Sequence, residues 1–172
     1  MTNDKIAVLV LAGGKSSRMG KDKAILEIEG KSLLQRSCSV AAVITSEVYV
    51  LTAWPDRYRS MLTTECQFLL EYRPETGPLV ALTQGLTEIA AEWILLLACD
   101  LPLLEADIIQ NWVDRLTEVP LSTLAVVPYQ NSRWEPLCGF YRRQSLSSLQ
   151  RFIESGGRSF QVWLNQIGAT PL

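Results

Sequence analysis

The stretch LAGGKSSRMGKDKA, which runs from Leu11 to Ala24, concentrates residue types that bind phosphate groups. Its glycines would let backbone amides approach a phosphate closely, and its hydroxyl side chains add further donors. Arginine offers a planar fork for phosphate oxygens, whereas lysine acts as a point charge. A solvated basic turn would have no need of two adjacent glycines, so the stretch predicts a phosphate-binding loop. The residues concerned are Gly13, Gly14, Lys15, Ser16, Ser17, Arg18, Lys21 and Lys23.

The spacing within this loop excludes two common phosphate-binding motifs. A Walker A loop requires a glycine five residues before the Gly14-Lys15 pair, and Leu9 occupies that position. A dinucleotide fingerprint requires Gly-x-Gly-x-x-Gly, but Gly13 and Gly14 are adjacent and Lys15 follows them. The loop therefore belongs to another class of nucleotide-binding structure.

Asp100 and the Gly77-Pro78 pair are the other candidates for chemistry. Asp100 follows the apolar run WILLLA and one cysteine, so it would lie at the carboxyl edge of a strand, where open α/β sheets bind ligands. A carboxylate there can hold Mg²⁺ against phosphates, and an Asp capping the turn before Pro102 is the structural alternative. The phosphate-binding loop predicted at Leu11–Ala24 favours the metal-binding role for Asp100. Gly77-Pro78 either places helix amides against a ligand or simply begins a helix.

The absence of histidine narrows the chemistry further. It excludes Ser-His triads, histidine bases and histidine-ligated metals, so catalysis must use carboxylates, lysine, arginine, backbone amides or an oxygen-ligated metal. The four cysteines have no paired spacing, which is typical of a reducing cytoplasm and argues against a zinc site. They are Cys38, Cys66, Cys99 and Cys138.

The elements that must position these residues alternate between strand and helix, which predicts an α/β domain with right-handed crossovers. The apolar runs scarcely alternate, so the sheet should be mainly parallel and covered on both faces. Strands are predicted at Ile6–Leu11, Val48–Leu51, Gln67–Leu70, Trp93–Ala98, Leu124–Val127 and Leu137–Tyr141, and helices at Leu33–Ile44, Leu79–Ile89 and Ala106–Leu116.

The secondary structure of three further segments can also be predicted from the sequence. Ile25–Gly30 alternates and predicts a small extended element. The turn 130–132 should join two strands in an antiparallel excursion at the sheet edge. The last thirty or so residues read as helical, with Gly156 and Gly157 dividing them into two pieces.

The composition is that of an ordinary globular domain. The chain has 172 residues, of which 48% are hydrophobic and 20% charged, and its net charge is −2. This charge argues against a nucleic-acid binder or a membrane-surface binder. The longest apolar runs have about seven residues, too few to span a bilayer, so we expect one cytoplasmic domain.

The loop resembles the signature L-A-G-G-x-S-x-R-M-G-x-D-K-A of the molybdenum cofactor guanylyltransferases, part of a superfamily that includes sugar-nucleotide pyrophosphorylases. Thr76-Gly77-Pro78-Leu79 is similar to the family's G-P-L segment, and Cys99-Asp100-Leu101-Pro102 is similar to its C-D-x-P. The resemblance continues in weaker form over most of the chain. The ending Asp22-Lys23-Ala24 favours the guanylyl branch over the cytidylyl one.

This resemblance implies a fold and an activity. The fold would be a single-domain, Rossmann-like three-layer sandwich of the nucleotide-diphospho-sugar transferase type, with a mainly parallel sheet. The nucleotide-binding half would cover about 1–100 and the acceptor-binding half about 101–172. The activity would be transfer of GMP from GTP to the molybdenum–molybdopterin cofactor, with release of pyrophosphate. Transient contact with cofactor-delivering or molybdoenzyme-specific proteins is a further implication.

The resemblance also assigns residues. Arg18 and Lys23 would act on the triphosphate, and Asp100 would hold Mg²⁺, so these three are the predicted catalytic residues. Asp22 would pair with Lys21 or Lys23, or orient the loop. The acceptor site would lie near Arg133, Trp134 and Glu135, for which an ordinary exposed turn is an equal alternative. The predicted nucleotide-binding residues are Leu11, Ala12, Gly13, Gly14, Ser16, Arg18, Lys23, Gly77, Pro78 and Asp100.

The chain departs from the family pattern at three places. The asparagine common after the second strand is replaced by Leu51 or Thr52, and Glu71 occupies the region of an aspartate. The family's Asn-x-Asn-Thr-Pro stretch, associated with acceptor binding, has no counterpart at 168–172. These departures concern the acceptor more than the nucleotide. The alternatives are a cytidylyltransferase or sugar-phosphate nucleotidyltransferase and, in another class, a non-catalytic nucleotide-binding module.

Overall fold

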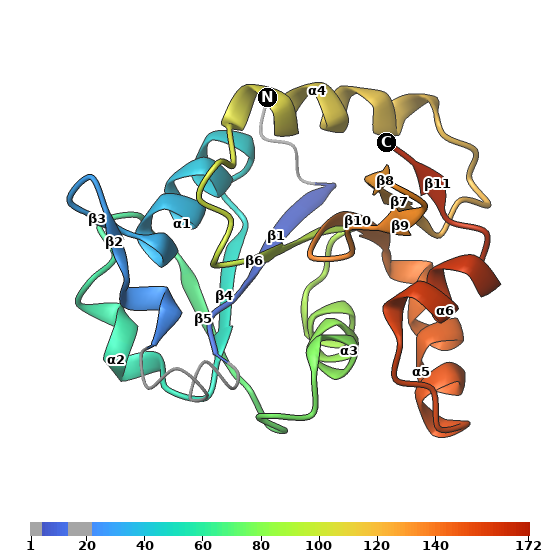
Figure 1. Cartoon of the computed structure of the whole chain (residues 1–172), viewed down its shortest axis with the longest axis horizontal. Helices are drawn as coiled ribbons and strands as arrows, with labels where there is room; N and C mark the ends of the chain where they lie inside the picture. Colours follow the sequence, from blue (N-terminus) through green and yellow to red (C-terminus); the bar gives the residue numbers. More distant parts are fainter. Residues whose placement is uncertain (1–4, 14–21) are drawn as a thin grey trace.

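The computed structural model describes residues 5–13 and 22–172, and Figure 1 shows their arrangement. Within these residues the main sheet has seven strands in the order β11-β7-β10-β6-β1-β4-β5. The six strands expected from the sequence all form in it, and β11 is an addition. Their bounds are β1 Ile6–Leu11, β4 Val48–Thr52, β5 Gln67–Leu70, β6 Trp93–Ala98, β7 Ala125–Val127, β10 Cys138–Arg142 and β11 Thr170–Pro171.

Strand β1 lies at the centre of the parallel part of the sheet. It pairs in parallel with β4 on one edge and with β6 on the other. Leu11, its last residue, lies opposite Leu51 of β4 and Ala98 of β6, so the three strands end level with one another. The loop after β1 and the segment carrying Asp100 therefore leave the sheet side by side, as the sequence predicts.

The antiparallel excursion forms, but its predicted place at the sheet edge is wrong. Strand β10 runs antiparallel to both neighbours and lies between β6 and β7. The residues of β10 are largely buried, because a strand lies on each of its edges and helices cover both faces of the sheet. The turn at 130–132 belongs to a separate hairpin of β8 Tyr129–Gln130 and β9 Arg133–Trp134.

Helices cover both faces of the sheet, which confirms the three-layer α/β fold (Figure 1). Helices α1 Leu33–Ile44 and α4 Ala106–Arg115 pack on one face with the short helix α2 Pro55–Arg59, which the sequence did not predict. The other face carries α3 Pro78–Glu88, α5 Leu146–Glu154 and α6 Phe160–Gln166. Gly156 and Gly157 separate α5 from α6, as expected. No helix among the described residues is long and apolar enough to cross a membrane.

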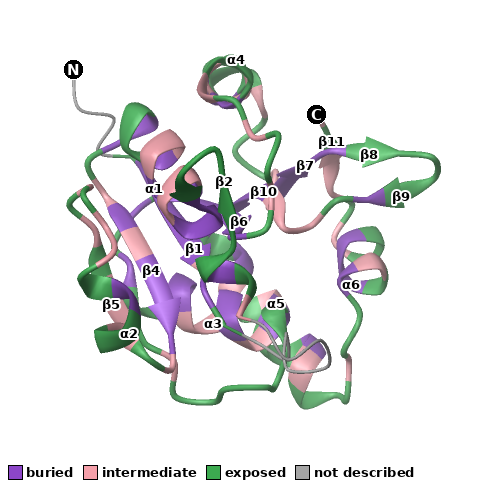
Figure 2. Cartoon of the chain, turned by 60° about the vertical axis from the view of Figure 1, so that its left-hand side comes forward, coloured by how far each residue is buried: buried purple, intermediate pink, exposed green. Residues whose placement is uncertain are grey.

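The predicted extended element at Ile25–Gly30 is only partly correct. Its first residue ends a 3₁₀ turn, η2 Lys23–Ile25, and the rest forms a hairpin of β2 Glu27–Ile28 and β3 Lys31–Ser32. Both residues of the two-residue turn, Glu29 and Gly30, have positive φ angles, which suits a tight hairpin. Figure 2 shows this hairpin exposed, in contrast to the buried strands of the main sheet.

Helix α3 approaches β1 unusually closely at Gly85. A side-chain carbon at this position would lie 2.3 Å from Cδ2 of Leu9, which is fully buried in β1. The missing side chain thus lets α3 lie flat against the sheet. Because α3 begins at the carboxyl edge of β1, this contact also sets where the helix begins relative to the end of that strand.

We therefore expect Gly85→Ala to destabilise the protein although alanine favours helices. Overpacking a core costs about 1–3 kcal/mol, and the gain in helix propensity returns about 1 kcal/mol. The free energy of unfolding in urea should fall by up to about 2 kcal/mol. The exposed Thr87 of the same helix provides the control, and Thr87→Ala should leave stability nearly unchanged. Equal stability of the two variants would contradict the close contact.

Candidate active site

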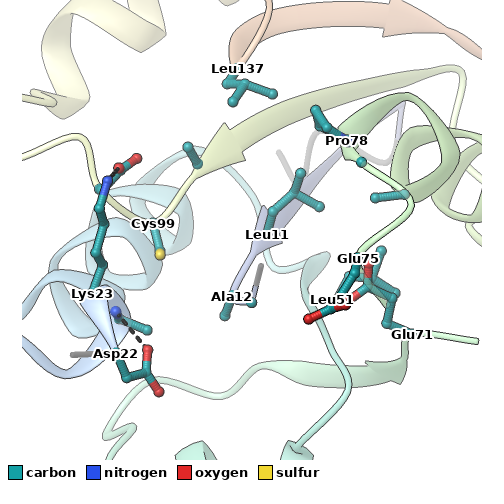
Figure 3. A pocket seen from close by; sticks show the side chains of 16 residues that line it. Leu11, Ala12, Asp22, Lys23, Leu51, Glu71, Glu75, Pro78, Cys99 and Leu137 are labelled. Atoms are coloured by element: carbon teal, nitrogen blue, oxygen red, sulfur yellow. Dashed lines mark hydrogen bonds and ion pairs between the residues drawn. The ribbon is translucent and has the colours of Figure 1, made fainter. Parts of the chain in front are cut away.

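A cavity of about 400 Å³ opens at the carboxyl edge of β1, β4 and β6 (Figure 3). The structure brings most of the predicted site residues to its wall. Three predicted residues, Gly14, Ser16 and Arg18, lie outside the described residues, and their roles stay predictions. The predicted residues that line the cavity are Leu11, Ala12, Gly13, Lys23, Gly77, Pro78 and Asp100.

Gly77 and Pro78 place the start of α3 against this cavity. Gly77 has a φ of 96°, which a residue with a side chain rarely adopts, and Pro78 supplies the φ of a first helical residue. Gly77 is itself the N-cap residue, so no side chain of the N-cap residue covers the first amides of α3. The positive end of the α3 dipole therefore faces the cavity wall, where it favours an anionic ligand.

Lys23 and Asp100 form an ion pair at one side of the cavity. The distance from Lys23 Nζ to Asp100 Oδ2 is 3.0 Å, and the two side chains are 47% and 40% exposed. The hydrogen bond to Asp100 and the charge of that carboxylate raise the pKa of Lys23. Lys23 is therefore a cation throughout the neutral range. Both groups remain accessible to solvent and hence to a ligand that competes for either one.

Asp22 does not pair with Lys23, contrary to one of its expected roles. Its Oδ2 accepts hydrogen bonds from the Tyr58 hydroxyl at 2.6 Å and from Arg57 at 3.1 Å, and Oδ1 accepts from the amide of Ala24 at 3.0 Å. Asp22 thus fixes the first turn of η2 against α2. The alternatives that Asp22 pairs with Lys21 or orients the loop stay predictions, because residues 14–21 lie outside the described residues.

Sequence reasoning missed these partners because Arg57 and Tyr58 lie in the short helix α2. Five residues are too few to show helical periodicity. The signal that could have found the helix is Pro55, a good first helical residue, followed by Asp56 in the first turn. Tyr58 is fully buried, and burial together with the Asp22 carboxylate raises the pKa of its hydroxyl.

Glu71 is a carboxylate in the cavity whose role the sequence left open. Its Oε2 lies 3.6 Å from the place where a side chain of Gly13 would begin, so it faces the backbone that follows β1. Burial raises the pKa of Glu71 above its ordinary range. A partly buried acceptor at the opposite side from Lys23 can receive hydrogen bonds from a nucleoside. Glu75 also lines this wall.

The two positions that replace the family's asparagine behave differently. Leu51 lines the cavity with an apolar side chain. Thr52 is fully buried, and its hydroxyl accepts a hydrogen bond from the amide of Trp54 at 3.1 Å. Cys99 is a further lining residue that the sequence did not assign. Burial and the charge of Asp100 raise the pKa of Cys99 to about 12, so its thiol stays protonated and is a poor nucleophile.

A second cavity of about 610 Å³ adjoins the first. Ala98, Asp100 and Leu137 line both, so Asp100 lies at the boundary between them. The outer wall includes Arg133 and Glu135, which are exposed, and the N-terminal residues of α6. Trp134 lies between these two residues but is only 7% exposed. The segment is therefore not an ordinary exposed turn.

The described residues contain no cluster of three or more His, Cys, Asp or Glu side chains able to hold a metal by themselves. Asp100 is nevertheless a half-exposed carboxylate at the wall that the two cavities share. This donor set suits Mg²⁺, which commonly takes one or two protein carboxylates and completes its shell with water and substrate phosphates. The arrangement as a whole can bind an anionic nucleotide in one cavity and present it to a second ligand in the other.

Comparisons with known proteins agree with this geometry. Residues 8–167 match the MobA-like NTP transferase domain. The chain is similar to a "Probable molybdenum cofactor guanylyltransferase" of Nostoc sp., with 48% identity over 161 residues, covering 94% of this chain and 77% of the relative. It is 41% identical over 168 residues to a protein of the same description from Synechococcus elongatus, covering 96% and 87%.

Solved structures show the same fold. A putative protein from Aquifex aeolicus superimposes with a TM-score of 0.78 at 23% identity, covering 99% of this chain and 87% of that one. The "Molybdopterin-guanine dinucleotide biosynthesis protein A" from Archaeoglobus fulgidus gives 0.77 at 19% identity, covering 96% and 82%. The fold is of the nucleotide-diphospho-sugar transferase type, and the chain belongs to the MobA-like NTP transferase family.

Proposed function

We propose that this protein transfers GMP from GTP to the molybdenum–molybdopterin cofactor, forming the guanine dinucleotide and releasing pyrophosphate. The observation that carries the proposal is the pair of adjoining cavities with Asp100 at their boundary. Two substrates held in separate cavities that meet at a charged residue can react at that point. The relatives named guanylyltransferases supply the identity of the donor and the acceptor.

The nucleotide would occupy the cavity beside β1. The start of α3 and the backbone at Ala12 and Gly13 would receive the nucleotide, with Arg18 gripping the triphosphate. Lys23 is 3.0 Å from Asp100 and half exposed, so it can exchange this partner for a phosphate oxygen. The charge that develops on the phosphate and on the leaving pyrophosphate would be stabilised by Lys23 and Arg18. Glu71 is placed to accept hydrogen bonds from the nucleoside.

Asp100 would hold Mg²⁺ together with substrate phosphates. The bound ion would supply electrostatic stabilisation of the phosphate oxygens. When Lys23 turns to phosphate, Asp100 loses its cationic partner, so a carboxylate becomes available at the boundary of the two cavities. The two residues thus have complementary tasks, one binding the anion and the other its counter-ion.

The acceptor would occupy the second cavity, beside Arg133 and Trp134. Its terminal phosphate is already ionised at neutral pH and can attack the α-phosphorus in line, so no protein base is needed. This agrees with a chain that has no histidine. The nucleotide-binding half would be about 1–100 and the acceptor-binding half about 101–172, in accord with the residues that line each cavity.

Two other functions are less well supported. A cytidylyltransferase or sugar-phosphate nucleotidyltransferase would use the same chemistry, but the relatives of highest identity named above are described as guanylyltransferases. A nucleotide-binding module without turnover would have no need of both Lys23 and Asp100 at the boundary. We further propose that the protein acts in the cytoplasm and meets cofactor-delivering or molybdoenzyme-specific proteins transiently.

The choice of donor and acceptor can be measured by pyrophosphate release with Mg²⁺ and GTP, CTP, ATP or UTP. We expect release with GTP, and only when the molybdenum–molybdopterin cofactor is present, because the second cavity must hold the nucleophile. Each nucleotide without acceptor is the control. Release with a sugar phosphate in place of the pterin would overturn the proposed acceptor, and release with CTP alone would overturn the donor.

Asp100→Ala should lower the rate of pyrophosphate release about a hundredfold or more, which is typical when one group that stabilises transition-state charge is lost. The fold should be retained, since a half-exposed ion pair contributes only about 0–1 kcal/mol to stability. Thermal unfolding checks the fold. Glu154→Ala, which removes an exposed carboxylate at the end of α5, is the control. A normal rate in the Asp100 variant would refute its assignment to the metal.

Lys23→Ala should weaken GTP binding by roughly tenfold to a hundredfold, because a charge-assisted hydrogen bond is worth about 1.5–3 kcal/mol. Equilibrium titration with GTP measures the loss. Lys5→Ala is the matched control, since Lys5 is exposed and precedes β1 at the opposite edge of the sheet. If both variants bind GTP as the unmodified protein does, Lys23 has no phosphate role.

A further inference from the structure

Two glutamine side chains, one on each of two helices, bind main-chain groups of segments that contribute residues to the walls of the two cavities. A glutamine carboxamide offers one carbonyl acceptor and an NH₂ donor, the same kinds of group as a peptide unit. It can therefore take the place of a neighbouring strand where a sheet has none. Gln161 of α6 and Gln84 of α3 each use both ends of the carboxamide in this way.

Gln161 binds the main chain of Trp134 in strand β9. Its Oε1 accepts from the Trp134 amide at 2.9 Å, and its Nε2 donates to the Trp134 carbonyl at 2.8 Å. Pairing with both groups of one residue is the pattern of an antiparallel neighbour. Asn165, one helical turn further on, accepts from the Trp134 indole at 2.8 Å. Helix α6 thus holds one residue of the hairpin by three hydrogen bonds.

Gln84 binds the far edge of the sheet just beyond β5. Its Nε2 donates to the carbonyl of Leu70 at 2.7 Å, and its Oε1 accepts from the amide of Tyr72 at 3.3 Å. Bonds to residues on either side of one position are the pattern of a parallel neighbour. The residue between them is Glu71, whose own amide donates to the Thr52 carbonyl on the inner side at 2.9 Å. Glu71 is thereby held from both edges.

Each glutamine therefore fixes a segment that supplies side chains to one cavity. The segment held by Gln84 places Glu71 in the first cavity, and the segment held by Gln161 places Arg133 and Glu135 at the wall of the second. Among the described residues, β8 and β9 pair as strands only with each other, and buried Trp134 anchors the hairpin to the core. Strand β5 is the last strand of the sheet at its edge. The glutamines thus supply main-chain hydrogen bonds that no neighbouring strand supplies at these places.

We propose that Gln84 and Gln161 are positioning residues, each dedicated to one substrate: Gln84 to the nucleotide through Glu71, and Gln161 to the acceptor through the β8–β9 hairpin. The division rests on the proposed function, since it takes the first cavity as the donor site and the second as the acceptor site. Neither glutamine acts on the reacting atoms. Each sets the geometry of side chains that contact a substrate.

The test uses Gln84→Met and Gln161→Met in the full chain, because methionine keeps the length of the side chain and removes the amide. For Gln161→Met we expect the KM for the molybdenum–molybdopterin cofactor to rise about tenfold and the KM for GTP to change less than about twofold. For Gln84→Met we expect the reverse. Each variant loses two main-chain hydrogen bonds of ordinary strength, which corresponds to a change of this size. Gln84→Met also loses an exposed hydrogen bond to Glu88 within α3.

Each variant is the control for the other, and Gln166→Met is the control within α6, because Gln166 is an exposed residue of the same helix. Gln161→Asn provides a second variant whose shorter side chain cannot span both main-chain groups. Amide hydrogen exchange gives a readout that does not depend on activity. Exchange at Trp134 should accelerate only in the Gln161 variants, and exchange at Tyr72 only in Gln84→Met.

The proposal is wrong if both KM values rise together in each variant, because that would show a general structural role. It is equally wrong if exchange accelerates at Trp134 and Tyr72 while neither KM changes. Failure of the proposed function is seen separately, as absence of GTP-dependent transfer in the unmodified protein. In that case equilibrium binding of GTP still decides the role of Gln84, and unchanged binding in Gln84→Met would overturn it.

Discussion

The parallel pairing of β1 with strands on both of its edges is the constraint on which the rest depends. Leu11, at the end of β1, lies opposite Leu51 of β4 and Ala98 of β6, so the segments after these three strands leave the sheet at one place. The pairing is secured by burial on both faces, since Ala7 to Val10 are fully inaccessible to solvent. A shift of β1 by one residue would move its side chains to the opposite faces and would separate the loops. The site is thus a consequence of strand register.

Two side chains of opposite charge meet at this edge of the sheet. Lys23 is placed by η2, whose first turn is held by Asp22 against α2, and Asp100 is placed by the end of β6. The two elements have no sequence continuity and meet only because their strands are neighbours. The resulting ion pair is accessible, so its stabilisation of the fold is small. The ion pair instead keeps a cation and a carboxylate accessible to ligands of opposite charge.

The sequence predicted the strands that build the site, because Ile6–Leu11 and Trp93–Ala98 are apolar on both faces and lie before polar loops. It also placed Asp100 at the edge shared with Lys23. It did not predict the position of β10, since a strand buried on both faces reads alike whatever its direction and neighbours. The partners of Asp22 were missed because α2 has only five residues. The roles of Arg18 and its neighbours lie outside the described residues and stay predictions from the sequence.

The reversed direction of β10 has a consequence for how the two cavities relate. Because β10 runs opposite to β6, the beginning of β10 lies beside the end of β6. The Ala98 amide donates a hydrogen bond to the Leu137 carbonyl there at 3.0 Å. The loop that enters β10 therefore reaches the ligand edge, while the loop that leaves it lies at the far end. The first cavity thus rests on the parallel strands around β1, whereas the segment that enters β10 supplies much of the wall of the second.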